Sequence, residues 1–214
     1  MNIGVDIDGV LTNIAEFTLK QGTKYCEENH TGKLINPNSY DSEKVFGWDA
    51  KTDLDFWTKN IFLYAETNPP IPKAAETIQR LKQEGHMIYI ITARWLANTG
   101  LFESAKLDRP QENTENAEKM RTTVKKWLAN NNICYDQIIF SGEDKSSHIV
   151  SKQIEVMIED SPSNLQSLSK LTKMICYDWP YNQEINHPDI FRCHNWDEIY
   201  QTIQKLVKGE ENKK

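Results

Sequence analysis

The sequence lacks several features that would assign it directly to a class of protein. Its 214 residues contain no apolar run long enough to span a bilayer, and we expect no secretory leader, because the chain enters a strand pattern at once. Lys and Arg number 25 against 31 Asp and Glu, which gives a net charge of -6. Binding to duplex nucleic acid or to an anionic membrane needs clustered basic residues, so we expect neither partner.

Cysteine and histidine are also scarce. The five histidines show no metal-ligand spacing, and the chain has no internal repeat or low-complexity segment. None of the cysteines forms a CxxC pair, so we expect reduced thiols in a cytoplasmic protein. The cysteines are Cys26, Cys134, Cys176 and Cys193.

Short segments rich in Ile, Val and Tyr recur along the chain and predict strands at 2–7, 86–92, 136–140, 154–160 and 173–178. Nearly continuous apolar character is typical of strands that are buried on both faces of a parallel sheet. Helical spacing of apolar residues predicts helices between or after them at 72–85, 116–132, 161–171 and 195–207. This alternation predicts an α/β fold with a Rossmann-like parallel sheet.

One region interrupts the alternation. Residues 13–70 contain no clear parallel strand and are dense in aromatic side chains, which predicts a small helical cap domain inserted into a core of residues 1–12 and 71–208. Residues 209–214 are expected to form a flexible tail. The stretch 94–116 is long for a loop, and loops of that length are usually functional or disordered. The second part of the insert, 46–64, contains the aromatic residues Phe46, Trp48, Phe56, Trp57, Phe62 and Tyr64.

Polar residues follow four of the predicted strands, at the sheet edge where ligands bind in open parallel folds. These residues are Asp6 and Asp8, then Thr92, then Lys145, and finally Glu159 and Asp160. Two carboxylates from different strands can hold a hard divalent cation such as Mg²⁺. One carboxylate can then attack phosphorus and a second can transfer protons, while a hydroxyl and an ammonium bind the phosphoryl oxygens. Lys152 is a rival to Lys145, but it precedes a strand and falls at the opposite edge.

Four stretches carry a resemblance to a known superfamily. They are "DIDGVLT", "IITAR", "EDKSS" and "VMIEDSPSN", in this order and each at the end of a predicted strand. They resemble the signature motifs of haloacid dehalogenase (HAD) type phosphatases. The resemblance implies a HAD-like core, Mg²⁺ as cofactor, a small phosphate ester as substrate and an aspartyl-phosphate intermediate.

Longer segments, "FSGEDKSSHIVSKQIEVMIEDSPSN" and "HNWDEIYQTI" among them, are similar to the 5'(3')-deoxyribonucleotidases of that superfamily. By this resemblance Asp6 is the nucleophile and Asp8 the general acid and base. The metal ligands would be Asp6, Asp160 and the backbone carbonyl of Asp8. The phosphate-binding residues would be Thr92, Ala93, Lys119 and Lys145. The cap would hold the nucleobase, with Phe46, Trp48, Trp57 and Tyr64 as pocket candidates.

Several assignments stay open at the level of sequence. Glu159 could bind the metal or only orient its ligands, and Lys119 could instead lie on a solvated helix face. Arg94 stands where the mammalian enzymes have proline; it could meet a phosphate or pair with the acidic loop that follows it. The cap aromatics could equally form the core of a small domain. Assembly into a homodimer is a further open question.

We therefore expect a Mg²⁺-dependent phosphomonoesterase that acts on nucleoside monophosphates, with deoxyribonucleotides as the preferred class. One alternative is the same chemistry on another small ester, such as a sugar phosphate. A second alternative is a catalytically idle binding protein on the same fold. A nucleic-acid-end phosphatase would need a basic groove, which the net charge does not suggest.

Overall fold

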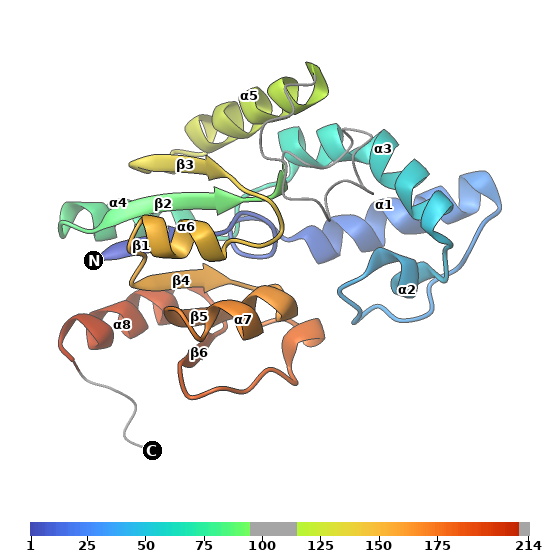
Figure 1. Ribbon diagram of the computed structural model, residues 1–214. Coiled ribbons are helices and arrows are strands. Elements are labelled where there is room, and N and C mark those ends of the chain that lie inside the picture. Colours follow the sequence, from blue (N-terminus) through green and yellow to red (C-terminus); the bar gives the residue numbers. More distant parts are fainter. Residues whose placement is uncertain (95–114, 210–214) are drawn as a thin grey trace.

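The computed structural model describes residues 1–94 and 115–209 (Figure 1). A six-stranded, wholly parallel sheet lies at its centre, in the order β3-β2-β1-β4-β5-β6. The strands are β1 (Asn2–Val5), β2 (Met87–Thr92), β3 (Gln137–Phe140), β4 (Val156–Glu159), β5 (Lys173–Tyr177) and β6 (Ile190–Cys193). The predicted α/β fold with a parallel sheet is confirmed, because this is the strand order of doubly wound Rossmann-type sheets.

Helices cover both faces of the sheet. On one face α4 (Ala74–Gln83), α5 (Glu115–Asn130) and α8 (Trp196–Val207) bury apolar side chains in the main core. On the other face, toward the viewer in Figure 1, α6 (Ser146–Ser151) and α7 (Pro162–Leu168) cover a second, smaller core. Burial on both sides explains why the strand sequences are almost continuously apolar.

The segment between β1 and α4 forms three helices: α1 (Ile14–Asn29), α2 (Ser42–Phe46) and α3 (Ala50–Thr67). The arrowheads of β2, β3 and β4 in Figure 1 point toward the side on which these helices lie. The side chains of Asn13 and Asp49 cap α1 and α3 by accepting hydrogen bonds from backbone amides. We refer to residues 13–70 as the cap and keep the domain division as a proposal.

Aromatic side chains form the interior of the cap. Phe46 stacks on Trp48 with 4.5 Å between ring centroids, and both are buried beside Tyr25 and Phe56. Gly22 of α1 makes this packing possible, because a Cβ there would lie 2.2 Å from the Phe46 ring. The cap therefore has an apolar core of its own, separate from the two cores of the sheet.

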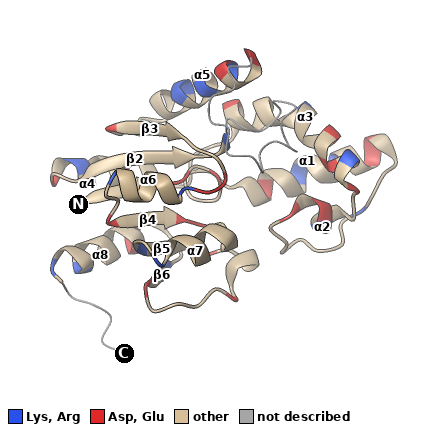
Figure 2. Ribbon diagram, in the orientation of Figure 1, with Lys and Arg blue, Asp and Glu red and all other residues tan. Residues whose placement is uncertain are grey.

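Charged residues of both signs are interspersed on the outer helices (Figure 2). Within the described ranges, none of the helices has the length and apolar character that a bilayer crossing requires. All four cysteines lie in the described part of the chain, and none is in a disulfide.

The sequence analysis did not predict the strand β6 or the helix α6. β6 contains Arg192, which interrupts its apolar run, and α6 has only six residues. Ser161 stands at the N-cap position before Pro162 as predicted, but its side chain makes no capping bond. Asn195 does cap α8, by accepting a hydrogen bond from the amide of Glu198.

Candidate active site

The candidate site lies where the strand order reverses, beyond the carboxyl ends of β1 and β4. The backbone amide of Asp6 donates to the Ile158 carbonyl over 3.0 Å, which extends the β1–β4 pairing by one residue. The Asp6 side chain consequently emerges beside Glu159 and Asp160. In doubly wound folds this reversal opens a crevice in which ligands bind.

Three buried carboxylates meet at this point. One oxygen from each of Asp6, Glu159 and Asp160 can be chosen so that all three lie within 4.8 Å of one another. Burial, together with the neighbouring charges of Glu159 and Asp8, raises the pKa of Asp6 to about 7 even though Lys145 opposes the shift. Burial and the charges of Glu159 and Asp6 also raise the pKa of Asp160 well above its usual range. The cluster therefore carries more negative charge than its protein partners neutralise.

Two cationic side chains balance part of this charge. Nζ of Lys145 lies 2.9 Å from Oδ1 of Asp6 and 2.8 Å from Oε2 of Glu159. Arg94 pairs with Asp8. Four carboxylates thus face two cations, and one divalent cation would neutralise the two negative charges that remain when all four carboxylates are ionised. An all-oxygen donor set with this charge fits a hard divalent ion.

Glu159 is the most constrained of the acids. Besides Lys145 it accepts hydrogen bonds from the backbone amide of Ser161 (3.3 Å) and from Nδ2 of Asn164 (3.2 Å), and it is fully buried. These contacts fix the Lys145 ammonium between Glu159 and Asp6. This arrangement fits an orienting role for Glu159. One of its oxygens also lies close enough to Asp6 and Asp160 to bind the same metal ion.

Asp160 is held by the loop that follows β5. Its Oδ2 accepts a hydrogen bond of 2.5 Å from the hydroxyl of Tyr181, and its backbone carbonyl accepts one from Asn182. Gly9 lies directly against this carboxylate, since a Cβ at Gly9 would stand 1.9 Å from Oδ2. Gly9 also has a φ of +74°, which favours glycine. Both observations explain the glycine in "DIDG".

Asp8 has different partners from Asp6. Oδ1 of Asp8 accepts hydrogen bonds from the Tyr64 hydroxyl (2.6 Å), from Nε of Arg94 (3.0 Å) and from Nη2 of Arg94 (2.5 Å). Tyr64 belongs to α3 of the cap, so the cap reaches the core through this carboxylate. The Asp8 side chain is 26% exposed, whereas the Arg94 side chain is fully buried.

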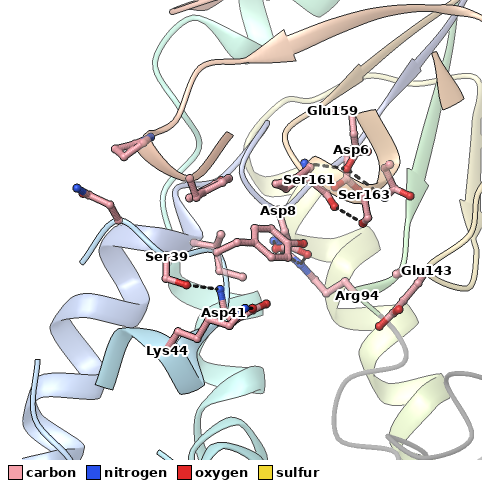
Figure 3. Close-up of a pocket in the computed structure, with 18 of the residues that line it drawn as sticks. Asp6, Asp8, Ser39, Asp41, Lys44, Arg94, Glu143, Glu159, Ser161 and Ser163 are labelled. Atoms are coloured by element: carbon pink, nitrogen blue, oxygen red, sulfur yellow. Dashed lines mark hydrogen bonds and ion pairs between the residues drawn. The ribbon is translucent and has the colours of Figure 1, made fainter. Parts of the chain in front are cut away.

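A cavity of about 890 Å³ joins these groups to the cap (Figure 3). Its floor contains Asp6, Asp8 and Lys145, and its cap side contains Trp57 and Tyr64. The volume lies within the range of roughly 300–1,000 Å³ that is typical of small-molecule sites. Other lining residues come from the cap loop, the start of α7 and the loop after β5: Ser39, Tyr40, Asp41, Lys44, Ser161, Ser163, Asn164 and Tyr181.

The structure separates the four cap aromatics expected at the pocket into two pairs. Trp57 and Tyr64 line the cavity, whereas Phe46 and Trp48 are buried in the interior of the cap. The placement of Phe46 and Trp48 at the pocket was therefore wrong. All four are aromatic residues of one helical insert, and only the packing of the helices decides which side each ring faces.

The predicted phosphate-binding residues are also separated. Lys145 and Ala93 line the cavity, and Thr92 is buried at the end of β2, where its hydroxyl accepts a hydrogen bond from the amide of Arg94. Lys119 does not line the cavity: it is exposed on α5, with Nζ 4.4 Å from the centre of the Phe62 ring. Lys119 therefore lies over the Phe62 ring of α3, and its role as a phosphate ligand stays a prediction.

Sequence reasoning missed the roles of Arg94 and Tyr181. Arg94 lines the cavity beside Asp6 and Asp8, and within the described residues its acidic partner is Asp8. The acidic part of that loop lies outside the described residues. Tyr181 follows the start of a short 3-10 turn (Pro180–Asn182) that has no periodic signal in the sequence.

The sheet order, the carboxylates after β1 and the acid pair at the end of β4 match the fold of HAD-superfamily hydrolases. Solved structures share this fold. A HAD-superfamily hydrolase from Ehrlichia chaffeensis matches with a TM-score of 0.54 and 16% identity, over 96% of this chain and 97% of that chain. A D,D-heptose 1,7-bisphosphate phosphatase from B. bronchiseptica, solved with magnesium and phosphate, matches with a TM-score of 0.51 and 12% identity, over 96% and 99% of the two chains.

The sequence places the chain more narrowly. It belongs to the 5' nucleotidase, deoxy (pyrimidine), cytosolic type C family, whose pattern matches residues 1–209. It is also similar to a nucleotidase of Clostridium acetobutylicum, with 24% identity over 99% of this chain and 97% of that one. The chain is therefore a HAD-type nucleotidase, and its family implies a small-molecule nucleotide substrate.

Proposed function

We propose that the protein is a Mg²⁺-dependent phosphatase that hydrolyses nucleoside monophosphates, with 5'- and 3'-deoxyribonucleotides as its preferred class. The observation that carries the proposal is the division of labour between Asp6 and Asp8. The two carboxylates open onto one cavity, but Asp6 is paired with Lys145 and Asp8 with Arg94 and Tyr64. Two acids with separate partners can serve as nucleophile and proton carrier in one reaction.

Asp6 is the nucleophile in this proposal. A carboxylate oxygen of Asp6 attacks the phosphorus, the bond from phosphorus to the ester oxygen breaks, and an aspartyl phosphate forms. Attack requires the ionised carboxylate, and Lys145 at 2.9 Å favours that form. The same ammonium can neutralise phosphoryl oxygens as the group is transferred.

Asp8 moves the protons. It gives a proton to the leaving ester oxygen, which departs as a nucleoside hydroxyl, and then takes a proton from the water that attacks the aspartyl phosphate. That second attack breaks the bond between phosphorus and the Asp6 oxygen and releases phosphate. The side chains of Asp6 and Asp160, with the backbone carbonyl of Asp8, are proposed to hold Mg²⁺, which when bound stabilises the charge on the transferred phosphoryl group.

The cap side of the cavity is proposed to receive the nucleoside. Trp57 and Tyr64 offer aromatic surface there, and the volume of about 890 Å³ is sufficient for more than a phosphate group. We also propose a cytoplasmic location, because the family description names a cytosolic type and none of the four cysteines is in a disulfide.

A hydrolysis panel tests the proposal. Purified protein is given 5'- and 3'-deoxyribonucleotides, ribonucleotides and sugar phosphates, with Mg²⁺ and with a chelator, beside the Asp6→Asn variant. We expect Mg²⁺-dependent release of phosphate that is fastest with deoxyribonucleotides and absent in the variant. Efficient cleavage of sugar phosphates with poor cleavage of every nucleotide would favour the alternative substrate class. Turnover of no substrate would favour an idle binding protein.

A further inference from the structure

We infer that Arg94 is a positioning residue for phosphoryl transfer: together with Tyr64 it engages one carboxylate oxygen of Asp8, Oδ1, and leaves Oδ2 to exchange protons with the substrate. This inference rests on the proposed role of Asp8 as the proton carrier. It assigns a function to a residue that the sequence left open between a phosphate ligand and a partner of the acidic loop.

The hydrogen bonds divide the two oxygens of Asp8 unequally. Oδ1 receives the Tyr64 hydroxyl and two nitrogens of Arg94 at 2.5 to 3.0 Å. Oδ2 receives only a longer contact of 3.2 Å from Nε of Arg94. A carboxylate oxygen has about two lone-pair directions for acceptance, so three donors leave Oδ1 no capacity for a further proton. Oδ2 is the oxygen that can still donate or accept one.

Arg94 is itself held rigidly. Its Nη2 also donates to the hydroxyl of Thr12 over 3.0 Å, and its guanidinium carbon lies 4.7 Å from the centre of the Tyr64 ring and 5.8 Å from that of Trp127. The side chain borders the cavity, but it is completely buried and its Nε and Nη2 donate to Asp8 and Thr12. These contacts favour a role in holding Asp8 over a role as a phosphate ligand.

The burial of Arg94 has a cost that stability alone does not explain. Within the described residues, Nη1 is buried without a hydrogen-bond acceptor. An unsatisfied buried donor is destabilising, and a buried ion pair is often no more stable than apolar residues of similar volume. A positioning role accounts for the cation, because the guanidinium fork fixes a carboxylate in a way that an apolar side chain or an ammonium cannot.

The inference has a chemical consequence that separates it from a merely structural role. A general acid contributes most when the leaving oxygen is a poor leaving group and little when the leaving group is stable as an anion. If Asp8 is no longer positioned, hydrolysis should therefore slow more for phosphate esters of weakly acidic alcohols than for those of acidic phenols. A variant that only weakens the fold would slow all esters by the same factor.

The test uses a series of substituted phenyl phosphates with graded leaving-group pKa and measures kcat/KM, which reports the first phosphoryl transfer. Arg94→Lys and Tyr64→Phe are compared with the wild type, and Arg80→Ala on the surface is the control. We expect Arg94→Lys to lose about 100-fold with the poorest leaving group, with little change for the most acidic phenol. Tyr64→Phe should also lower kcat/KM most with the poorest leaving group, but by a smaller factor. Arg80→Ala should leave kcat/KM unchanged for every phenyl phosphate.

Chemical rescue adds a second readout. Arg94→Ala removes the guanidinium from a closed site, and added guanidinium chloride, far below denaturing concentrations, should restore kcat/KM for the poorest leaving group. Urea has a similar shape but no charge and should not restore it. Equal rescue by urea, or an equal loss across the whole phenyl series in Arg94→Lys and Tyr64→Phe, would overturn the inference.

Asp8→Asn in the same series distinguishes this failure from failure of the proposed function. If Asp8→Asn leaves the dependence on leaving group unchanged, Asp8 is not the acid and the proposed function fails. If Asp8→Asn steepens that dependence and the Arg94 variants do not, only the inference about Arg94 fails.

Discussion

The chain contains two trios of arginine, carboxylate and tyrosine in very different surroundings. At the site, Arg94 and Tyr64 both donate to Asp8. On the outer surface between α4 and α8, Nε of Arg80 lies 3.3 Å from Oε1 of Glu84, and the Tyr200 hydroxyl donates to the same oxygen over 2.6 Å. The Arg80 guanidinium also lies over the Tyr200 ring, at 3.9 Å, as that of Arg94 lies over Tyr64.

What differs most is the exposure of the arginine. The side chains of Arg80 and Glu84 are 60% and 33% exposed, whereas those of Arg94 and Asp8 are 0% and 26% exposed. Exposed pairs contribute little because water and salt compete for both charges, while a buried pair fixes the geometry of both partners. Similar groups therefore make an interchangeable surface contact in one place and a defined geometry at the candidate site in the other.

The largest expected difference between the trios is in kcat/KM when the carboxylate of each is neutralised. Asp8→Asn should lower kcat/KM for a nucleoside monophosphate by about 10²–10⁴-fold, because the proton carrier is lost. Glu84→Gln should leave kcat/KM unchanged, because Glu84 lies on the outer surface. Steady-state kinetics on the two variants measures this contrast, and equal activity of both would remove the functional distinction between the trios.

Two glycines with positive φ, Gly9 at the site and Gly85 after α4, allow a similar comparison. Gly85, after α4, has a φ of +88°, and a Cβ at this position would meet no atom within 4 Å, so Gly85→Ala should cost only the backbone strain of about 1–2 kcal/mol. Gly9→Ala adds a clash with Asp160 to similar strain and should displace that carboxylate. We expect Gly9→Ala to lose turnover and Mg²⁺ affinity and Gly85→Ala to retain both. Calorimetric Mg²⁺ titration and denaturant unfolding check the two outcomes.

The tyrosines predict a smaller difference, in stability. Tyr64→Phe deprives Asp8 and Thr12 of a buried hydrogen-bond partner, and we expect it to lower the free energy of unfolding by about 1–3 kcal/mol. Tyr200→Phe removes a hydroxyl that water can replace, so the midpoint of unfolding should not change. Urea unfolding of both variants provides the comparison. A loss for Tyr200→Phe that matches the loss for Tyr64→Phe would contradict the role assigned to burial.

The smallest expected effect is that of salt on the melting temperatures of the arginine variants. The Debye length falls to about 3 Å at 1 M salt, so the exposed Arg80–Glu84 contact is screened more strongly than the contact of the buried Arg94 with Asp8. The difference in melting temperature between wild type and Arg80→Ala should therefore vanish in high salt, while most of that for Arg94→Lys persists. Thermal unfolding in low and high salt measures both, and equal salt sensitivity of the two differences would contradict the role assigned to burial.

Part of this site could be predicted from the sequence because topology decides it. Parallel strands bring their carboxyl ends to one edge, so residues that follow strands, such as Asp6, Lys145 and Asp160, meet however far apart they are in the chain. The apolar strands β1 to β5 were recognisable for the same reason: both of their faces are buried. Strand β6 was not recognisable, because it carries Arg192 among its apolar residues.

The remaining features depend on packing between segments, which no local pattern encodes. The partner of Arg94 is decided by how the end of β2 lies beside the loop after β1, which carries Asp8. The packing of the cap helices decides that Tyr64 faces Asp8 while Phe46 stacks on Trp48 inside the cap. Packing also decides that Lys119 of α5 lies over the Phe62 ring.

The most direct test of the account is the detection of a phosphoryl group on Asp6. In Asp8→Asn, para-nitrophenyl phosphate should still transfer its phosphoryl group, because its leaving group needs little protonation, while hydrolysis of the aspartyl phosphate is slow. The account predicts a burst of one para-nitrophenol per active site with Mg²⁺ present, and mass spectrometry of the quenched protein should find the phosphoryl group on the peptide containing Asp6. Steady turnover without a burst, and with no phosphoryl group on that peptide, would contradict it.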